Sequence, residues 1–249
     1  MGGITTDLRA GLAFCTRLPV TATAGARLAD AAWTFPIAGT VVGLIGGVVL
    51  YVALALNLPP FVTATLAVAA TALATGCLHE DGLADTADGF GGGHERARVL
   101  EILRDSRIGT YGVIALIVSF LLRIGALSGL AAAGAGPAIL ALIAAHTGAR
   151  GALPLLMRAV PRAREDGLSA GAGRPSANVA AGAVALGIVV MLVCLGFGAT
   201  LVSAVLVAVA LVLLARMAIR KIGGQTGDVL GTAEQAGEVL ILLTAAALP

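Results

Sequence analysis

The sequence predicts an all-helical protein that crosses a membrane several times. Of its 249 residues, 58% are hydrophobic and 12% are charged, whereas a soluble domain carries about 25% charged residues. A soluble protein with so few charges would expose large apolar patches. The hydrophobic residues also gather in stretches of about 20, the length that an α-helix needs to cross a bilayer. These observations exclude a soluble enzyme, a disordered chain and a nucleic-acid-binding protein.

Six apolar stretches meet this length criterion within one integral membrane domain, residues 1–249. We expect transmembrane helices at residues 31–58, 59–78, 111–133, 137–157, 178–197 and 200–219. The final apolar stretch, residues 238–248, is too short for a confident crossing. We expect it to form a short helix that docks between the others or re-enters the membrane.

The charges gather on one side of this predicted bundle. The turns at residues 57–60, 134–137 and 196–200 carry no charge. All fourteen acidic residues and most basic ones lie in four other segments, residues 1–30, 79–110, 158–177 and 220–238. The positive-inside rule makes that side cytoplasmic. We therefore expect a multi-pass protein of the cytoplasmic (inner) membrane, with both termini and the active site facing the cytoplasm.

The densest polar segment begins where the second predicted helix reaches the cytoplasmic face. It starts at His79 and reads His-Glu-Asp-Gly-Leu-Ala-Asp-Thr-Ala-Asp-Gly. Asp81, Asp85 and Asp88 have the spacing i, i+4, i+7, which places them on one face of a helix. Neighbouring carboxylates repel one another unless a cation holds them, and oxygen ligands suit Mg²⁺ or Mn²⁺ better than zinc. We expect these three aspartates to bind Mg²⁺ and act in catalysis, with Glu80 as an auxiliary ligand or base; a solvated acidic loop is the alternative.

Glycines and arginines follow this acidic segment, within the predicted active-site segment at residues 79–110. Gly91 and Gly92 allow backbone N–H groups to approach phosphate oxygens, although a flexible connector has the same composition. Arg104 and Arg107 can clamp a phosphate with their forked guanidinium donors. The alternative for each arginine is anchoring of the chain at the cytoplasmic face.

Arg123, His146 and Arg150 are basic residues that lie within the predicted transmembrane helices. A charge at this depth is costly unless it faces a polar cavity or a partner. The bodies of the six predicted helices contain no acidic residue. We therefore expect the three residues to contact an anionic substrate or to pair with carboxylates such as Glu234 and Glu238.

A second glycine-rich motif covers residues 223–238. Thr226 and Asp228 stand between glycines there, and we expect both to bind substrate, together with His79. Carboxylates, glycines and arginines at a membrane surface predict metal-assisted transfer at a diphosphate. In such a reaction the protein supplies mainly position and electrostatic stabilisation.

The run His-Glu-Asp-Gly-Leu-Ala-Asp-Thr-Ala-Asp-Gly-Phe-Gly-Gly-Gly at residues 79–93 resembles the signature of the adenosylcobinamide-GDP ribazoletransferase family, also called cobalamin synthases. The resemblance extends to residues 100–112 and to further matches from residue 14 to residue 238. It implies a Mg²⁺-dependent membrane enzyme that joins adenosylcobinamide-GDP to α-ribazole, or to α-ribazole 5′-phosphate. The products would be adenosylcobalamin (vitamin B12) or its 5′-phosphate, and GMP. We also expect a homo-oligomer or an association with other enzymes of cobalamin nucleotide-loop assembly.

Two other functions stay open from the sequence. The run Asp-Gly-Leu-Ala at residues 81–84 also resembles part of the motif of CDP-alcohol phosphotransferases that act on lipids, but Asp85 replaces the arginine that follows the alanine in that motif. A transporter would use Arg123, His146 and Arg150 as a path through the membrane. The scarcity of polar loops on the outer side argues against a transporter.

Overall fold

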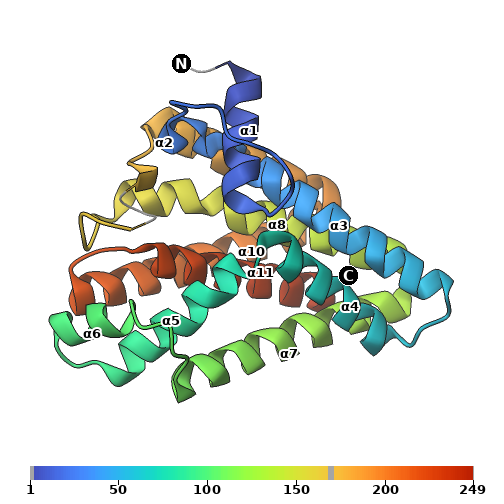
Figure 1. The fold of residues 1–249 in the computed structure, drawn as a ribbon. Helices are drawn as coiled ribbons and strands as arrows, with labels where there is room; N and C mark the ends of the chain where they lie inside the picture. The colour runs from blue at the N-terminus through green and yellow to red at the C-terminus, as the bar shows by residue number, and fades with distance from the viewer. Residues whose placement is uncertain (1–2, 168–170, 249) are drawn as a thin grey trace.

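The computed structural model describes residues 3–167 and 171–248, and this part of the chain is built from helices without a β-strand. The elements in chain order are α1 (Ile4–Cys15), α2 (Leu28–Ala31), the 3₁₀ helix η1 (Ala32–Thr34), α3 (Phe35–Ala55), α4 (Pro60–Thr75), α5 (Leu78–Gly92), α6 (Arg96–Ile102), α7 (Thr110–Ala133), α8 (Ala135–Ala159), α10 (Ala177–Ile222) and α11 (Gly227–Ala247). The long helices pack as a bundle (Figure 1). Five helices are long and apolar enough to cross a membrane, or six if α4 and α5 together form one broken span. The prediction of a polytopic helical bundle is therefore confirmed.

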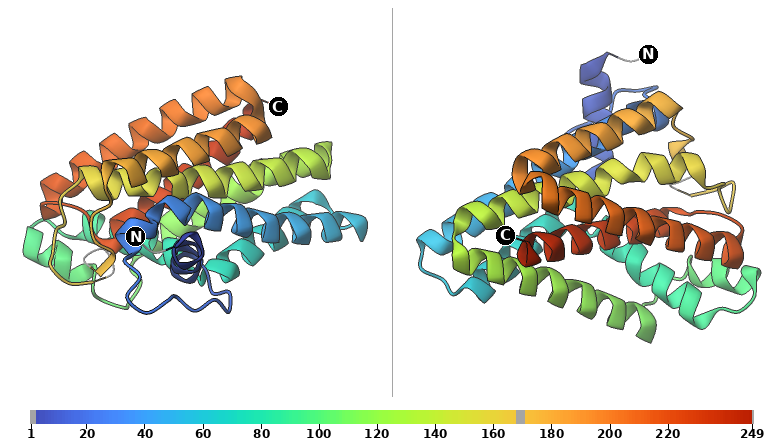
Figure 2. Two further views of the ribbon diagram at one scale, coloured as in Figure 1. Left: turned by 90° about the horizontal axis from the view of Figure 1, so that it is seen from above. Right: turned by 180° about the vertical axis from the view of Figure 1, so that it is seen from behind.

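Helix α10 contains the fifth and sixth predicted transmembrane helices. It is interrupted at Gly196, which has φ 73° and ψ 179°. Only glycine adopts this combination of angles readily, because it has no Cβ. At this point the chain turns back, so that the two arms, residues 177–195 and 197–222, form a helical hairpin (Figure 2).

The second predicted helix, residues 59–78, is broken near its end. Helix α4 ends at Thr75, and Gly76 and Cys77 both adopt left-handed backbone angles. Helix α5 then leaves at 90° to α4. The acidic segment is consequently a helix inside the bundle, packed against α7 and α11, and not a loop at its surface.

The prediction of a separate short helix at residues 238–248 is wrong, because these residues form the second half of the 21-residue helix α11. As predicted, this segment packs between the other helices. Helix α11 is itself long and apolar enough to cross a membrane. The sequence obscures this because α11 carries three acidic residues, Asp228, Glu234 and Glu238. Ala245 packs in the same cluster as Leu130 and Ala138, which flank the uncharged turn at Gly134. Helix α11 thus ends beside an uncharged turn (Figure 2). The sequence instead predicts both termini on the charged side.

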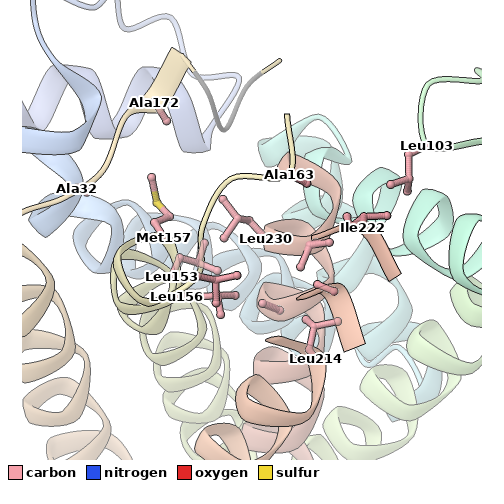
Figure 3. Packing of buried hydrophobic residues seen from close by; sticks show 14 of the residues in the cluster. Ala32, Leu103, Leu153, Leu156, Met157, Ala163, Ala172, Leu214, Ile222 and Leu230 are labelled. Carbon is pink, nitrogen blue, oxygen red and sulfur yellow. The ribbon is translucent and has the colours of Figure 1, made fainter. Parts of the chain in front are cut away.

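Two apolar clusters form the core of the bundle. The cluster nearer the charged connections includes Leu153 and Met157 of α8, Ile222 of α10 and Leu230 of α11 (Figure 3). The other cluster lies toward the uncharged turns and includes Leu142 of α8. Along both α8 and α11, buried polar residues separate the stretches that contribute to the two clusters. The core is therefore interrupted by a polar layer.

Large apolar side chains also cover the outside of α7 and of both arms of α10. They include Ile114, Ile117, Leu121, Val193, Leu201, Val205 and Val209, all exposed. Apolar surface of this extent is unfavourable in water and matches the hydrocarbon of a bilayer. The outer faces of α7 and α10 are the surfaces that would face lipid.

Helices α3 and α8 approach each other closely at Gly39, and this contact gives a first prediction. A Cβ at Gly39 would lie 2.9 Å from the Cα of Thr147 and still closer to the carbonyl oxygen of His146. Replacing Gly39 by Ala should lower the free energy of unfolding by about 1–3 kcal/mol, because backbone atoms cannot move aside. Thermal unfolding of the detergent-solubilised protein measures the loss. The control is G125A, since a Cβ at Gly125 would meet nothing within 4 Å; equal unfolding temperatures for the two variants would contradict the prediction.

Candidate functional site

Helices α5 and α11 cross with their backbones in close contact. A Cβ at Gly82 would lie 2.9 Å from the carbonyl oxygen of Asp228 and 3.2 Å from the Cα of Gly231. The hydroxyl of Thr232 donates a hydrogen bond to the carbonyl oxygen of Gly82 at 3.1 Å. This crossing explains why the sequence has glycines here, and it brings the acidic segment of α5 next to the start of α11.

Three carboxylates lie near this crossing, Asp81, Asp85 and Asp228, although among the described residues they do not form a set with three ligand atoms within 4.8 Å of one another. Asp81 is exposed, and Asp85 and Asp228 are half-buried. Asp85 experiences the negative charges of Asp81, Asp228 and Asp88, in that order of strength. Such a cluster favours a bound cation, because the carboxylates repel one another in its absence. The structure thus brings together two of the predicted metal ligands on α5 and the predicted site residue Asp228.

Asp228 is also held by its own turn. Thr226 caps the N-terminus of α11: its hydroxyl oxygen accepts from the N–H of Val229 at 3.4 Å, and the hydroxyl donates to Asp228 at 3.0 Å. Arg164 lies 3.7 Å from the same carboxylate oxygen of Asp228. Sequence reasoning missed Arg164, although it stands in the charged segment at residues 158–177.

Asp88, the third predicted metal ligand, is engaged by the start of α7. One carboxylate oxygen accepts from the N–H of Gly109 at 2.6 Å and the other from the N–H of Gly112 at 2.9 Å. A carboxylate at a helix N-terminus satisfies N–H groups that lack partners within the helix and interacts favourably with the helix dipole. Asp88 thereby joins α5 to α7, and both of its oxygens already have donors.

The predicted phosphate-binding glycines, Gly91 and Gly92, belong to the last turn of α5. They form no loop, which contradicts the expectation of a glycine-rich cradle. The ammonium group of Lys221 donates to the carbonyl oxygens of Phe90 and Gly93, at 2.5 and 3.1 Å. A cation suits the C-terminal end of a helix, and Lys221 therefore stabilises this end of α5.

The two predicted phosphate arginines are paired with aspartates at the surface. Arg104 donates to both carboxylate oxygens of Asp166, at 2.7 and 3.0 Å, and lowers the pKa of Asp166. Arg107 binds Asp105 and lowers its pKa to about 2. Both pairs are largely exposed to solvent, and neither contacts the three clustered aspartates.

The polar layer between the two apolar clusters is a buried network of ion pairs. Arg123 lies 3.2 Å from Glu80 and 2.9 Å from Glu238. Arg150 pairs with Glu234. All five side chains are almost fully buried. The network therefore joins α5, α7, α8 and α11, and it confirms the expectation that Glu234 and Glu238 provide partners for the buried arginines.

Two histidines complete this network. The Nδ1 atom of His146 lies 3.2 Å from Glu238, and that of His79 lies 3.7 Å from Glu234. Among the described residues, His146, Glu234 and Glu238 form a group that could hold a metal ion. Each offers one ligand atom, and these atoms lie within 4.8 Å of one another. Because both glutamates already face arginines, charge balance there does not require a metal ion.

A small apolar cavity adjoins the α5–α11 crossing. Phe14 of α1 and Phe35 of α3 line it and stack with their ring centroids 5.5 Å apart. Its remaining lining comes from apolar residues of α5, α8 and α11, Ala172, two glycines of α11, and the imidazole of His79. The cavity is small, about 40 Å³, is lined mainly by apolar side chains, and lies next to the turn of α11 that carries Asp228.

Comparison with known proteins adds an independent finding. The profile described as cobalamin-5-phosphate synthase matches residues 7–246. A protein from Bradyrhizobium diazoefficiens named adenosylcobinamide-GDP ribazoletransferase is 54% identical over 97% of this chain and 93% of its own length. Proteins of the same name from Azorhizobium caulinodans and Mesorhizobium japonicum are 47% and 45% identical over 96% of this chain, and over 95% and 92% of their own lengths. No solved structure matches the chain.

Removing one arginine of the buried network should be strongly destabilising. R123Q leaves Glu80 and Glu238 buried without their cation, and loss of one partner of a buried ion pair costs about 3–5 kcal/mol. Thermal unfolding in detergent measures the effect. The control is R27Q, which breaks the exposed pair of Arg27 with Asp30 and should cost less than about 1 kcal/mol. If R123Q were as stable as R27Q, the network would not have the role assigned here.

Asp88 and Asp85 should respond differently to loss of charge. D88N should lower the free energy of unfolding by about 1–2 kcal/mol, because the start of α7 loses a charged acceptor. D85N should leave stability unchanged or raise it, because it removes repulsion between carboxylates. The measurement is the unfolding temperature of both variants at low Mg²⁺. A D85N protein less stable than D88N would contradict this assignment.

Proposed function

Since the chain belongs to the cobalamin-5-phosphate synthase family, we propose that it catalyses the transfer in the name of its relatives. The enzyme joins adenosylcobinamide-GDP to α-ribazole, or to α-ribazole 5′-phosphate, and releases GMP. The products are adenosylcobalamin or its 5′-phosphate. The observation that supports the proposal is the close crossing of α5 and α11 at Gly82, which places Asp81 and Asp85 near Asp228.

The reaction exchanges one phosphorus–oxygen bond for another. A hydroxyl oxygen of the ribazole forms a bond to the phosphorus that carries cobinamide. The bond from this phosphorus to the bridging oxygen breaks, and GMP leaves with that oxygen. The hydroxyl proton passes to solvent. The protein needs to place a diphosphate and an alcohol in line and to balance the negative charge on the phosphates.

The donor set at the crossing fits Mg²⁺. Asp81, Asp85 and Asp228 offer only carboxylate oxygens, the ligands that Mg²⁺ prefers, and they are accessible to solvent. They need not all reach the ion directly, because Mg²⁺ in proteins keeps several waters and binds one or two carboxylates plus substrate phosphates. When bound, Mg²⁺ would neutralise charge on the diphosphate. Asp88 is the weaker candidate, since the start of α7 occupies both of its oxygens.

The apolar cavity beside the aspartates supports an aromatic acceptor. The base of ribazole is a flat, uncharged ring system, and the stacked rings of Phe14 and Phe35 offer a matching surface. We therefore place the ribazole ring against the apolar lining of this cavity, which at about 40 Å³ is too small to enclose the ring, and the diphosphate over the aspartates.

We propose that the active site faces the cytoplasm across the inner membrane. The charged connections and the three clustered aspartates lie at one end of the bundle, and the arginines there favour the cytoplasmic side. Both substrates are polar or charged, so that a site open to the cytoplasm reaches them without their crossing the bilayer. Association with itself or with other enzymes of the same assembly stays a prediction.

The proposal predicts loss of activity without loss of folding in D85N. Release of GMP is measured for protein in liposomes with Mg²⁺, adenosylcobinamide-GDP and α-ribazole. D85N should retain less than about 1% of the activity, because it removes a charge that holds the cation, whereas D30N at the exposed pair with Arg27 should keep it. Wild-type activity in D85N would remove Asp85 from the site. A wild-type protein that is inert here, or that instead uses a CDP-activated lipid, would refute the proposed function.

A further inference from the structure

Resting on the transferase function proposed above, we propose that Arg164 binds the diphosphate of the substrate. It reaches Asp228 from the connection between α8 and α10, which is remote from α5 and α11 in the sequence. Neither Arg104 nor Arg107 contacts those aspartates. Arg164 is thus the arginine that the fold places beside the predicted cation site.

The chain just before Arg164 is fixed to the turn before α11. The N–H of Ala163 donates to the carbonyl oxygen of Gln225 at 3.0 Å, and the N–H of Gln225 donates to that of Pro161 at 2.8 Å. Arg96 of α6 donates to the carbonyl oxygens of Ala163 and Ile222, both at 2.9 Å. These bonds hold the start of the connection against α6 and against the turn between α10 and α11.

The chain just after Arg164 is held as well. The two hydrogen bonds from Arg104 to Asp166 attach it to the segment after α6. Arg104 was predicted to bind phosphate, but in this arrangement it positions the loop that carries Arg164. Such anchoring on both sides reduces the conformational freedom that an arginine loses when it binds a ligand.

The guanidinium of Arg164 is only partly satisfied by the protein. Its Nε lies 3.6 Å from Asp166 and its Nη2 lies 3.7 Å from Asp228, both too long for good hydrogen bonds. Its Nη1 is buried and has no acceptor. The side chain is 17% exposed. The guanidinium therefore makes only long contacts within the protein and keeps the capacity to donate to an oxygen anion that approaches its exposed part.

A diphosphate is the anion that this position suits best. Arginine has a planar fork of donors that matches two phosphate oxygens. A group bound between Arg164 and a cation on Asp81 and Asp85 would be neutralised from two sides. A carboxylate would also match this fork of donors. The substrate of the proposed reaction carries a diphosphate, however, and its two phosphates need more positive charge than the cation alone supplies.

The alternative is that Arg164 only neutralises Asp228. The two roles differ in their effect on binding. If Arg164 binds the diphosphate, its removal weakens nucleotide binding. If it only neutralises Asp228, its removal strengthens Mg²⁺ binding, because a competing cation is lost, and leaves nucleotide binding unchanged.

The test measures the binding of GDP, which contains a diphosphate but no cobinamide, to the full-length protein in nanodiscs with Mg²⁺. R164Q should weaken GDP binding about 10- to 100-fold, as expected for a charge-assisted hydrogen bond. R164K should retain part of the affinity, because lysine supplies charge without the fork. The matched control is R174Q, since Arg174 lies in the same connection, is exposed, and donates to the carbonyl oxygen of Arg158; its GDP affinity should equal that of the wild type.

Turnover provides a second readout. R164Q should raise the KM for adenosylcobinamide-GDP and leave the KM for α-ribazole unchanged. Unchanged GDP affinity in R164Q together with tighter Mg²⁺ binding would overturn the role of Arg164. If R164Q does not fold, R164K carries the same test, and full GDP affinity in R164K overturns the proposed fork. GDP binding that depends on Arg164 in a protein without transferase activity would support this role while refuting the proposed reaction.

Discussion

The buried ion pairs of Arg123 and Arg150 are the interaction on which the rest of the structure depends. Each arginine lies deep in the bundle and pairs with carboxylates from other helices. A lone charge at this depth would be costly. The partners offset that cost only while α5, α7, α8 and α11 keep their relative positions. The network therefore restricts the four helices to one arrangement, beyond what apolar packing requires.

The position of the candidate site follows from this arrangement. Glu80 connects α5 to the network, and the next residue along the chain is Asp81. Glycine contacts set the distance between α5 and α11, and Asp88 attaches the far end of α5 to α7. Helix α5 is thus held at three points along its length. Asp81 and Asp85 lie between these points and face Asp228 and the polar connections at the charged end.

Sequence reasoning selected the segments that meet at the candidate site better than the contacts of individual residues. The carboxylates Asp81, Asp85 and Asp228 could be proposed as site residues because acidic residues are rare in this chain and cluster beside glycines. Asp88, Arg104 and Arg107 have the same local appearance, but the fold gives them donors or acceptors of their own. Spacing along one helix says which residues share a face. It does not say what an element distant in sequence brings to that face.

The sequence alone determined that this is a helical membrane protein, where most spans lie and which segments are charged, because hydrophobicity and helix length are local properties. It also carried the family resemblance. Only the tertiary structure decided that α11 is a full-length helix, because its Glu234 and Glu238 are buried against arginines of other helices. The tertiary structure likewise decided which arginine stands beside the aspartates. That choice depends on hydrogen bonds between segments far apart in the chain, and no local pattern encodes them.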